Sequence, residues 1–550
     1  MRLINARTLE LREFFEADLP PYAILSHTWE DGEVTFQDMA AGPDGKRASK
    51  KAFAKIRETC GLALEYGLEY AWVDTCCIDK SSSAELTESI NSMFRWYAKA
   101  HVCFVYLADL ASGVDLKEGL AYCRWLTRGW TLQELIAPHD LFFFDSAWSC
   151  RGSKENFVDV LHDKTGIDRG ILMGETPLSK RSVAHKMSWA ASRETARVED
   201  AAYCLLGIFD VHIPLIYGEG KMAFRRLQEE IVKRSIDMTI FGWDPLEDVD
   251  RSCGDFVGAF APSPAAFRLS SAVEQATNAV DDPGFSVTNK GLRVQTILSF
   301  LLDKTALHPD VNDAFEPSGV RDMYFLQVGG AESEGPALVM IALRKVGVDL
   351  FVRLAVRSFL IQLFDPPQLN AVRESSFYIM TDNLPSRQSV ALLRTSGIHF
   401  RPQRELEIVA VNPDTHWDHT DRCIFSMKST EVVPALLVYS SIQSKRFCFI
   451  ILCAPQFREG YKFKIFEAEN DPIRAKLATS LFRLGESGSF SRWIATRRTA
   501  MSVHELDTLP ELRGLKHYVM VDFDHMVFHV SVEYWTESRK YLHLSVKQVA

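Results

Sequence analysis

Hydrophobic residues in the first 150 positions gather in short unbroken runs, at residues 22–25, 70–73, 102–107 and 140–145. Between these runs, residues 48–66 and 85–99 place apolar side chains three and four positions apart, which is the spacing of a helix with one apolar face. Strands that are apolar along their whole length and alternate with helices indicate a parallel sheet covered on both faces. We therefore predict an α/β domain over residues 1–150.

The pattern changes twice further along the chain. Residues 151–243 are helical in pattern, most clearly at 197–209 and 220–234. After Trp243, proline and glycine residues mark a boundary. Alternating apolar and polar positions, which are typical of strands, follow at residues 323–328, 461–466 and 518–532. We predict a helical extension over 151–243 and a β-rich region over 244–550.

Composition narrows the class of protein. The net charge is −10 and no block of lysine and arginine stands out, which argues against binding to nucleic acid. No window approaches the ~18 uninterrupted apolar residues of a membrane span, and the amino terminus lacks the apolar core of a signal peptide. The 11 cysteines are scattered, as in proteins with reduced thiols. These features predict a cytoplasmic protein without nucleic-acid or membrane partners.

Two clusters of cysteine or histidine residues are candidates for a metal site. Cys76 and Cys77 are adjacent and lack the Cys-x-x-Cys spacing of ligands, so we expect small buried residues there. The stretch His-Trp-Asp-His at 416–419 has no partner pair elsewhere in the sequence, which favours a solvated polar loop. We predict neither a metal site nor a permanently bound cofactor.

Polar side chains follow several of the predicted strands. Ser26 and His27 come after the first strand, Asp74 after the second and Asp109 shortly after the third, and Glu134 lies on the connection beyond. In open α/β sheets, ligands bind beyond the carboxyl ends of the strands. We therefore expect these distant polar groups to meet at one edge of the sheet.

Three blocks of the sequence resemble the signature of the fungal heterokaryon incompatibility (HET) domain. They are YAILSHTW at 22–29, WVDTCCID at 72–79 and RGWTLQEL at 128–135. The segments 197–207 and 217–220 are similar to the usual close of that domain, and residues 260–293 to the extension that often follows it. The resemblance covers roughly the first 240 residues. It implies a role in programmed cell death after non-self recognition, a form of fungal innate immunity.

HET domains in turn resemble Toll/interleukin-1 receptor (TIR) domains, which have a flavodoxin-like parallel sheet. The segment WTLQEL at 130–135 is similar to the TIR motif Trp-Cys-x-x-Glu-Leu, with Thr131 in place of the cysteine. In enzymatic TIR domains, this glutamate is needed to cleave the nicotinamide–ribose bond of NAD. The resemblance therefore implies a TIR-like fold, NAD as a substrate and Glu134 as the catalytic carboxylate.

This chemistry gives each of the candidate residues a role. Cleavage of an N-glycosidic bond passes through an oxocarbenium-like transition state, which Glu134 would stabilise. Trp29 would stack on a ring of the dinucleotide. Ser26, His27 and Asp74 would bind its hydroxyls or phosphates.

Each of these residues also has a structural alternative. Glu134 could pair with Arg124 or Arg128, since ion-pair networks also retain such carboxylates. His27 could be a hydrogen-bonded loop histidine, and Asp74 could bind backbone amides at the end of a strand.

Two alternative functions follow from these interpretations of the sequence. In the first, the protein is an NAD glycohydrolase (NADase) whose activity is toxic on activation. In the second, it is a non-catalytic module that self-associates or binds a protein partner while the β-rich half detects a signal. Glu134 discriminates between them, because an enzyme needs this side chain in an open pocket whereas a scaffold could bury it in a salt bridge.

Overall fold

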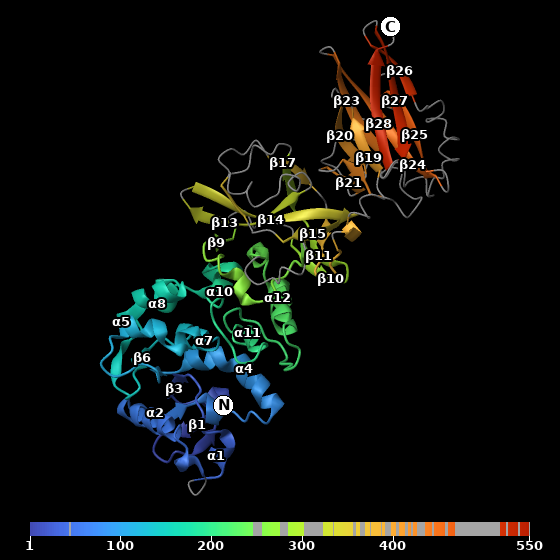
Figure 1. Cartoon of the computed structure of the whole chain (residues 1–550). Helices are drawn as coiled ribbons and strands as arrows, with labels where there is room; N and C mark the ends of the chain where they lie inside the picture. Colours follow the sequence, from blue (N-terminus) through green and yellow to red (C-terminus); the bar gives the residue numbers. More distant parts are fainter. Residues whose placement is uncertain are drawn as a thin grey trace.

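The computed structural model describes most of the amino-terminal half of the chain and much of the rest (Figure 1). The described residues are 1–42, 46–245, 256–275, 284–301, 323–333, 335–355, 359–362, 369–373, 376–386, 388–390, 398–402, 406–412, 416–419, 422–425, 435–442, 445–456, 460–467, 518–523, 526–536 and 540–548.

A seven-stranded sheet forms the centre of the amino-terminal domain, in the order β2-β1-β4-β3-β5-β6-β7. Its four middle strands are parallel: β4 (Tyr70–Trp72), β3 (Tyr22–His27), β5 (Val102–Tyr106) and β6 (Leu141–Phe144). All six residues of β3 are buried, as expected for a strand covered on both faces. The four predicted apolar strands are confirmed.

The edges of this sheet differ from the prediction. β1 (Arg2–Asn5) pairs antiparallel with β2 (Leu11–Glu13) and β4, and β7 (Cys150–Ser153) pairs antiparallel with β6. A purely parallel sheet is therefore wrong at its edges, where the sheet is mixed. These strands are only three or four residues long and contain polar residues, so they form no apolar run that marks them in the sequence.

Helices cover both faces of the sheet. α2 (Phe53–Glu65) packs on β3 and β4, and α4 (Ser83–Lys99) lies on the other side (Figure 1). The indole of Trp72 in β4 meets Trp96 and Tyr97 of α4 edge-on, with ring centroids 5.7 and 5.9 Å apart. Ser82 caps the start of α4, because its side chain accepts a hydrogen bond from the backbone N–H of Glu85. The predicted amphipathic helices are confirmed.

Short helices complete this half of the molecule. α7 packs against β3 and α4. The bounds are α1 (Phe36–Ala40), α3 (Asp74–Cys77), α5 (Leu116–Gly119), α6 (Arg124–Thr127), α7 (Thr131–Ile136), α8 (Val158–Thr165), α9 (Arg169–Leu172), α10 (Val183–Ser188), α11 (Asp200–Tyr203) and α12 (Met222–Arg234).

The helical extension is confirmed at α12 but not in full at 197–209. There only α11 (Asp200–Tyr203) is an α-helix, and the chain continues in turns. Gly207 lies so close to α4 that a Cβ on it would be 2.1 Å from Cβ of Phe94. The apolar periodicity of this segment therefore reflects burial of turns against α4, not a longer helix.

The rest of the described chain is rich in strands, as predicted. An 11-stranded sheet contains β8 (Phe256–Val257), β9 (Val273–Glu274), β10 (Ser286–Thr288), β11 (Gly291–Val294), β12 (Ile297–Leu301), β13 (Tyr324–Ser333), β14 (Gly335–Gly347), β15 (Leu350–Leu354), β16 (Phe359–Gln362), β17 (Leu369–Arg373) and β18 (Phe377–Ile379). A second sheet, of six strands, contains β19 (Ile398–Pro402), β21 (Trp417–Asp418), β22 (Cys423–Ile424), β26 (Tyr518–Phe523), β27 (Met526–Thr536) and β28 (Lys540–Gln548). A third, of four strands, contains β20 (Leu406–Asn412), β23 (Ala435–Ile442), β24 (Lys445–Gln456) and β25 (Gly460–Glu467).

One hydrophobic core runs from Leu3 to Ile379, so it crosses the predicted boundaries at 150 and 243. Those boundaries stay predictions, since a shared core neither requires nor forbids separate domains. Within the described ranges, no helix has the length and apolar character needed to cross a membrane.

The two cysteine and histidine clusters have different outcomes. Cys76 and Cys77 are buried free thiols, as predicted. The solvated loop predicted at 416–419 is wrong, because Trp417 and Asp418 form the buried strand β21. Trp417 packs against Phe400, with ring centroids 5.6 Å apart, and this contact helps to bury the strand. Among the described residues, no group of three or more histidine, cysteine, aspartate or glutamate side chains could hold a metal ion.

Candidate functional site

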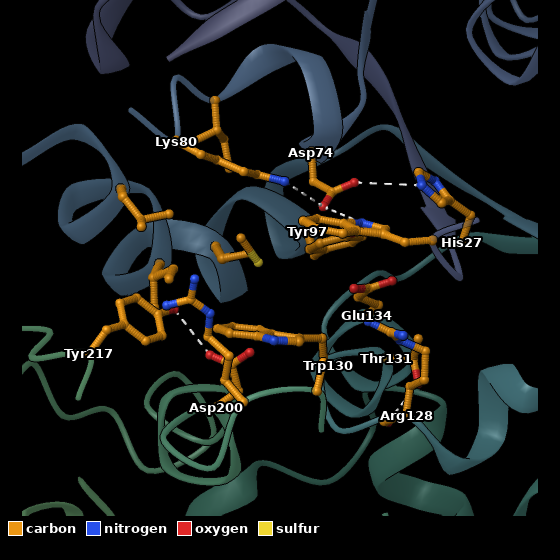
Figure 2. A pocket seen from close by; sticks show the side chains of 17 residues that line it. His27, Asp74, Lys80, Tyr97, Arg128, Trp130, Thr131, Glu134, Asp200 and Tyr217 are labelled. Carbon is orange, nitrogen blue, oxygen red and sulfur yellow. Dashed lines mark hydrogen bonds and ion pairs between the residues drawn. The ribbon is translucent and has the colours of Figure 1, made fainter. Parts of the chain in front are cut away.

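A cleft of about 270 Å³ lies beyond the carboxyl ends of β3 and β4 (Figure 2). Ligands of open α/β sheets bind beyond the carboxyl ends of the strands. The cleft is lined by His27, Trp29, Asp74, Ile78, Lys80, Leu86, Ile90, Met93, Tyr97, Arg128, Trp130, Thr131, Glu134, Ala196, Arg197, Asp200 and Tyr217.

Glu134 lines the inner end of the cleft, with its carboxylate between Asp74 on one wall and Trp130 on the other (Figure 2). The residue is only 7% exposed. Its Oε2 accepts a hydrogen bond from the hydroxyl of Ser26. No ion pair joins this carboxylate to any residue that the structure describes. A buried carboxylate without a counter-ion is costly, because burial removes the water that stabilises its charge.

The environment of Glu134 disfavours its charged form. Burial raises its pKa to about 8, and the negative charge of Asp74 acts in the same direction. The hydrogen bond from Ser26, the positive charge of Arg128 and the contact with Tyr97 oppose this rise. A carboxyl group with a pKa near neutral pH can exchange a proton during a reaction, and such groups cluster at functional sites.

Hydrogen bonds at both ends of α7 fix the position of Glu134. At the start of the helix, Nη1 of Arg193 donates to the carbonyl oxygen of Arg128 at 2.8 Å and to Oγ1 of Thr131 at 3.0 Å. At its end, Nζ of the buried Lys154 donates to the backbone carbonyl oxygens of Leu135 at 3.3 Å and Pro138 at 2.5 Å. Burial lowers the pKa of Lys154 to about 8. The helix is therefore a rigid support for the carboxylate.

Gly129 brings the start of this segment against residues 194–195. Its backbone N–H donates to the carbonyl oxygen of Glu194 at 2.8 Å, and a Cβ on Gly129 would lie 2.5 Å from Cγ2 of Thr195. We predict that Gly129→Ala lowers the free energy of unfolding by about 1–3 kcal/mol through this overlap. In Gly129→Ala/Thr195→Ser, which removes Cγ2 and keeps the hydroxyl, urea unfolding should show most of the loss recovered. Equal losses in the single and double variants would exclude this contact as the cause.

One wall of the cleft combines an aromatic ring with charged groups. Nε1 of Trp29 donates to Oδ2 of Asp74 at 2.9 Å, and Nζ of Lys80 lies 3.5 Å from the centroid of the Trp29 ring. Lys80 is also 3.8 Å from Asp74. Burial lowers the pKa of Lys80, and the charge of Asp74 opposes this. The indole is thus held in a fixed orientation at the mouth of the cleft, where it is 43% exposed.

His27 closes this wall on the inside. Its Nε2 lies 3.8 Å from Asp74 and 3.8 Å from Glu33, too far for a hydrogen bond. Neither ring nitrogen has a hydrogen-bond partner within the described chain. Burial lowers the pKa of His27, and the carboxylate of Asp74 opposes this. The imidazole is therefore neutral near pH 7, with two buried ring nitrogens that have no hydrogen-bond partner among the described residues.

The opposite wall comes from the segments at 128–130, 196–200 and 217. The hydroxyl of Tyr217 donates to Oδ1 of Asp200 at 3.0 Å, and the guanidinium of Arg197 lies 4.4 Å from the centroid of the Tyr217 ring. Burial raises the pKa of Asp200, and contacts with Trp130 and Tyr217 oppose this. This wall therefore also pairs an aromatic surface with a cation.

Four of the five residues predicted to form a site lie together. His27, Trp29, Asp74 and Glu134 line the same cleft, although their roles toward a ligand stay predictions. Ser26 does not line it, because its side chain is fully buried behind Glu134.

The predicted alternatives for the charged groups are resolved differently. Asp109 lies apart from the cleft, where it accepts a hydrogen bond from the backbone N–H of Arg124 at 2.8 Å and lies 3.6 Å from that side chain. Arg124 is therefore occupied with Asp109, and Arg128 faces the cleft without an ion pair to Glu134. The salt bridge expected for a purely structural Glu134 is absent from the described part of the chain.

The sequence analysis did not assign to the site several residues that complete the walls, although it named Arg128 as a possible partner of Glu134. Arg128, Trp130, Arg197, Asp200 and Tyr217 lie within the motif blocks, so their membership in those blocks was the signal that could have identified them. Lys80 and Tyr97 carry no such signal, since one follows a short helix and the other is a core-facing position of α4.

Comparison with known proteins agrees with the sequence motifs. Residues 22–117 match the family model "Heterokaryon incompatibility protein (HET)", and residues 222–276 match "Domain of unknown function (DUF8212)". The chain is 49% identical over 225 residues to vegetative incompatibility protein HET-E-1 of Podospora anserina. This match covers 39% of the chain and 16% of that protein, so the chain spans a small part of its relative's length. No solved structure matches.

Proposed function

Since this chain is a HET-domain protein, we propose that it acts in heterokaryon incompatibility and that its cleft cleaves the nicotinamide–ribose bond of NAD. The relative's name supports the first part, and the resemblance of 130–135 to the TIR motif supports the second. The observation that carries the proposal is Glu134, a buried carboxylate without a counter-ion at the inner end of a ligand-sized cleft.

The shape and chemistry of the cleft suit a dinucleotide. Trp29 and Trp130 offer aromatic surfaces for flat rings on opposite walls. Arg128 and Lys80 supply positive charge for phosphates, while His27 supplies two unpaired ring nitrogens for hydroxyls. A volume of about 270 Å³ accommodates part of a dinucleotide and leaves the remainder at the open mouth.

The proposed reaction needs no bound metal. The bond between C1′ of the ribose and the ring nitrogen breaks with its electron pair going to nitrogen, so that the pyridinium leaves as neutral nicotinamide. The positive charge passes to the ribose, where the carboxylate of Glu134 stabilises it. A water molecule then attacks C1′ and transfers its proton to Glu134, from which solvent removes it. The products are nicotinamide, ADP-ribose and one proton.

The raised pKa of Glu134 fits this role because NAD is itself charged at the reacting ring. In the free protein, the carboxyl group is mostly protonated below pH 8. A cationic ring placed beside it favours the carboxylate, as any close opposite charge does. Binding of the substrate would thus produce the charged form that the transition state requires.

The test is consumption of NAD by the purified full chain, followed by chromatography of nicotinamide and ADP-ribose. We expect wild-type protein at high concentration to release both products, and Glu134→Gln to lower kcat/KM by about 100-fold or more. High concentration matters because the resemblance to TIR domains implies self-association. The matched control is Glu118→Gln, an exposed glutamate of the same domain, which should leave the rate unchanged.

Two outcomes would count against the enzyme. Equal rates in wild type and Glu134→Gln would exclude Glu134 as the catalytic group. If no concentration of wild-type chain consumes NAD, the non-catalytic assembly module becomes the better proposal. The incompatibility role is tested separately, by expressing wild type and Glu134→Gln in a fungal host and counting viable cells.

A further inference from the structure

A chain of two hydrogen bonds leads from the core of the domain to Glu134. Nε1 of Trp125, on α6, donates to Oγ of Ser26 at 2.7 Å, and Oγ of Ser26 donates to Oε2 of Glu134. The side chains of Trp125 and Ser26 are fully buried. Trp125 is held in place by Phe143 of β6, with the two rings edge-on at 5.8 Å. Ser26 lies about a hundred residues before both Trp125 and Glu134 in the sequence, and the three groups meet in the core.

The direction of these bonds is fixed by chemistry. An indole N–H can only donate, so Oγ of Ser26 must accept the bond from Trp125. The single proton of the hydroxyl is then left for Glu134, the one other hydrogen-bond partner that the structure gives to this oxygen. Turning that proton away would leave a buried donor without an acceptor, which is unfavourable. Ser26 therefore donates to Oε2 whether or not Glu134 is ionised.

We infer that Ser26, oriented by Trp125, is a positioning residue that holds Oε2 of Glu134 and leaves Oε1 as the atom that meets the ligand. This differs from the ligand-binding role that the sequence predicts for Ser26. Because Oε2 is occupied as an acceptor, the proton of the neutral carboxyl group resides on Oε1, and a reaction in the cleft exchanges it there. The inference rests on the proposed function for its kinetic consequence, but not for its structural one.

Substitution of Ser26 tests the inference through the titration of Glu134. The hydrogen bond from Ser26 stabilises the carboxylate, so Ser26→Ala should raise the pKa of Glu134 by about one unit. In the pH–rate profile of NAD cleavage, the midpoint should shift upward by that amount. Ser26→Thr keeps the hydroxyl and should restore the wild-type midpoint. Ser89→Ala, at a buried serine of α4 that does not line the cleft, should not move it.

A second measurement needs neither activity nor a change at Ser26. The indole N–H signal of Trp125, assigned in an NMR spectrum with Trp125→Phe, should move with pH with a midpoint near 8 in wild type. It should be insensitive to pH in Glu134→Gln. An indole signal that behaves alike in both proteins, or a midpoint unmoved by Ser26→Ala in a folded protein, would overturn the inference. Absence of NAD cleavage with a titrating indole would instead refute the proposed function alone.

Discussion

Glu134→Gln should make the protein several kcal/mol more stable than wild type at alkaline pH, with a much smaller difference at pH 5.5. Burial raises the pKa of Glu134 in the folded protein from 4.5 to about 8. Between these values the folded state binds a proton that the unfolded chain does not, so this group favours folding fully below about pH 4.5. That contribution is lost as the pH rises through about 8, and the total amounts to roughly 3–5 kcal/mol.

The measurement is urea unfolding of both proteins at pH 5.5 and 8.5. The charge of Glu134 also acts on the pKa values of Tyr97, Cys103 and Arg193, but these groups keep one protonation state between pH 5.5 and 8.5. The change in the stability difference therefore isolates Glu134. We expect the difference to favour Glu134→Gln by several kcal/mol more at pH 8.5 than at pH 5.5. The exposed control Glu118→Gln should show the same pH dependence as wild type. A stability difference that stays constant over this range would show that Glu134 titrates as an ordinary carboxyl group.

This test separates the effect of Glu134 on folding stability from its role in the reaction. A carboxylate that destabilises the fold at the pH where the protein works needs a reason outside folding. If Glu134→Gln both raises stability and removes NAD cleavage, the two results together describe an active-site group held against its own electrostatic preference. If stability rises and neither protein cleaves NAD, Glu134 is costly to the fold without this enzymatic use, and the non-catalytic assembly module becomes the better proposal.

The sequence was sufficient where burial is complete. β3 and β5 are apolar throughout because helices cover both of their faces, and an unbroken run of this kind has few other interpretations. α4 and α12 follow from the spacing of their apolar positions. In contrast, β7 has no apolar run, since it lies at the edge of the sheet and its residues are exposed or half-buried. Only the fold reveals it.

The site was predictable as a meeting point but not as a cleft. That Asp74 and Glu134 converge follows from the parallel strands, whose carboxyl ends share one edge. The far wall does not follow from this rule, because Asp200 and Tyr217 reach the cleft through turns in the helical extension. The orientation of Ser26 was equally hidden: its position at a strand end is compatible with facing a ligand or with facing Trp125, and only packing decides.

The second prediction with a large effect concerns the junction between the helical extension, which ends near Trp243, and the sheet that contains β15. Arg353 on β15 is buried, and its guanidinium donates to the carbonyl oxygens of Phe241 at 2.8 Å and Trp243 at 2.5 Å. It also lies 4.0 Å from the centroid of the Trp243 ring. Burial lowers the pKa of Arg353 to about 9, and the charge of Asp244 opposes this. One side chain thus joins the end of the helical extension to the sheet that follows it.

We predict that Arg353→Met lowers the free energy of unfolding by about 3–5 kcal/mol, because it leaves two buried carbonyl oxygens without the charged donor that they share. Arg353→Lys should restore only part of the loss, since an ammonium lacks the planar fork that reaches both carbonyl groups. Arg293→Met, at an exposed arginine of the same sheet, should change stability by less than about 0.5 kcal/mol. Urea unfolding of the full chain measures all three variants. A single substitution usually changes the free energy of unfolding by ~1 kcal/mol. If Arg353→Met lowers it by no more than this, the continuous core between these regions holds the junction together without this arginine.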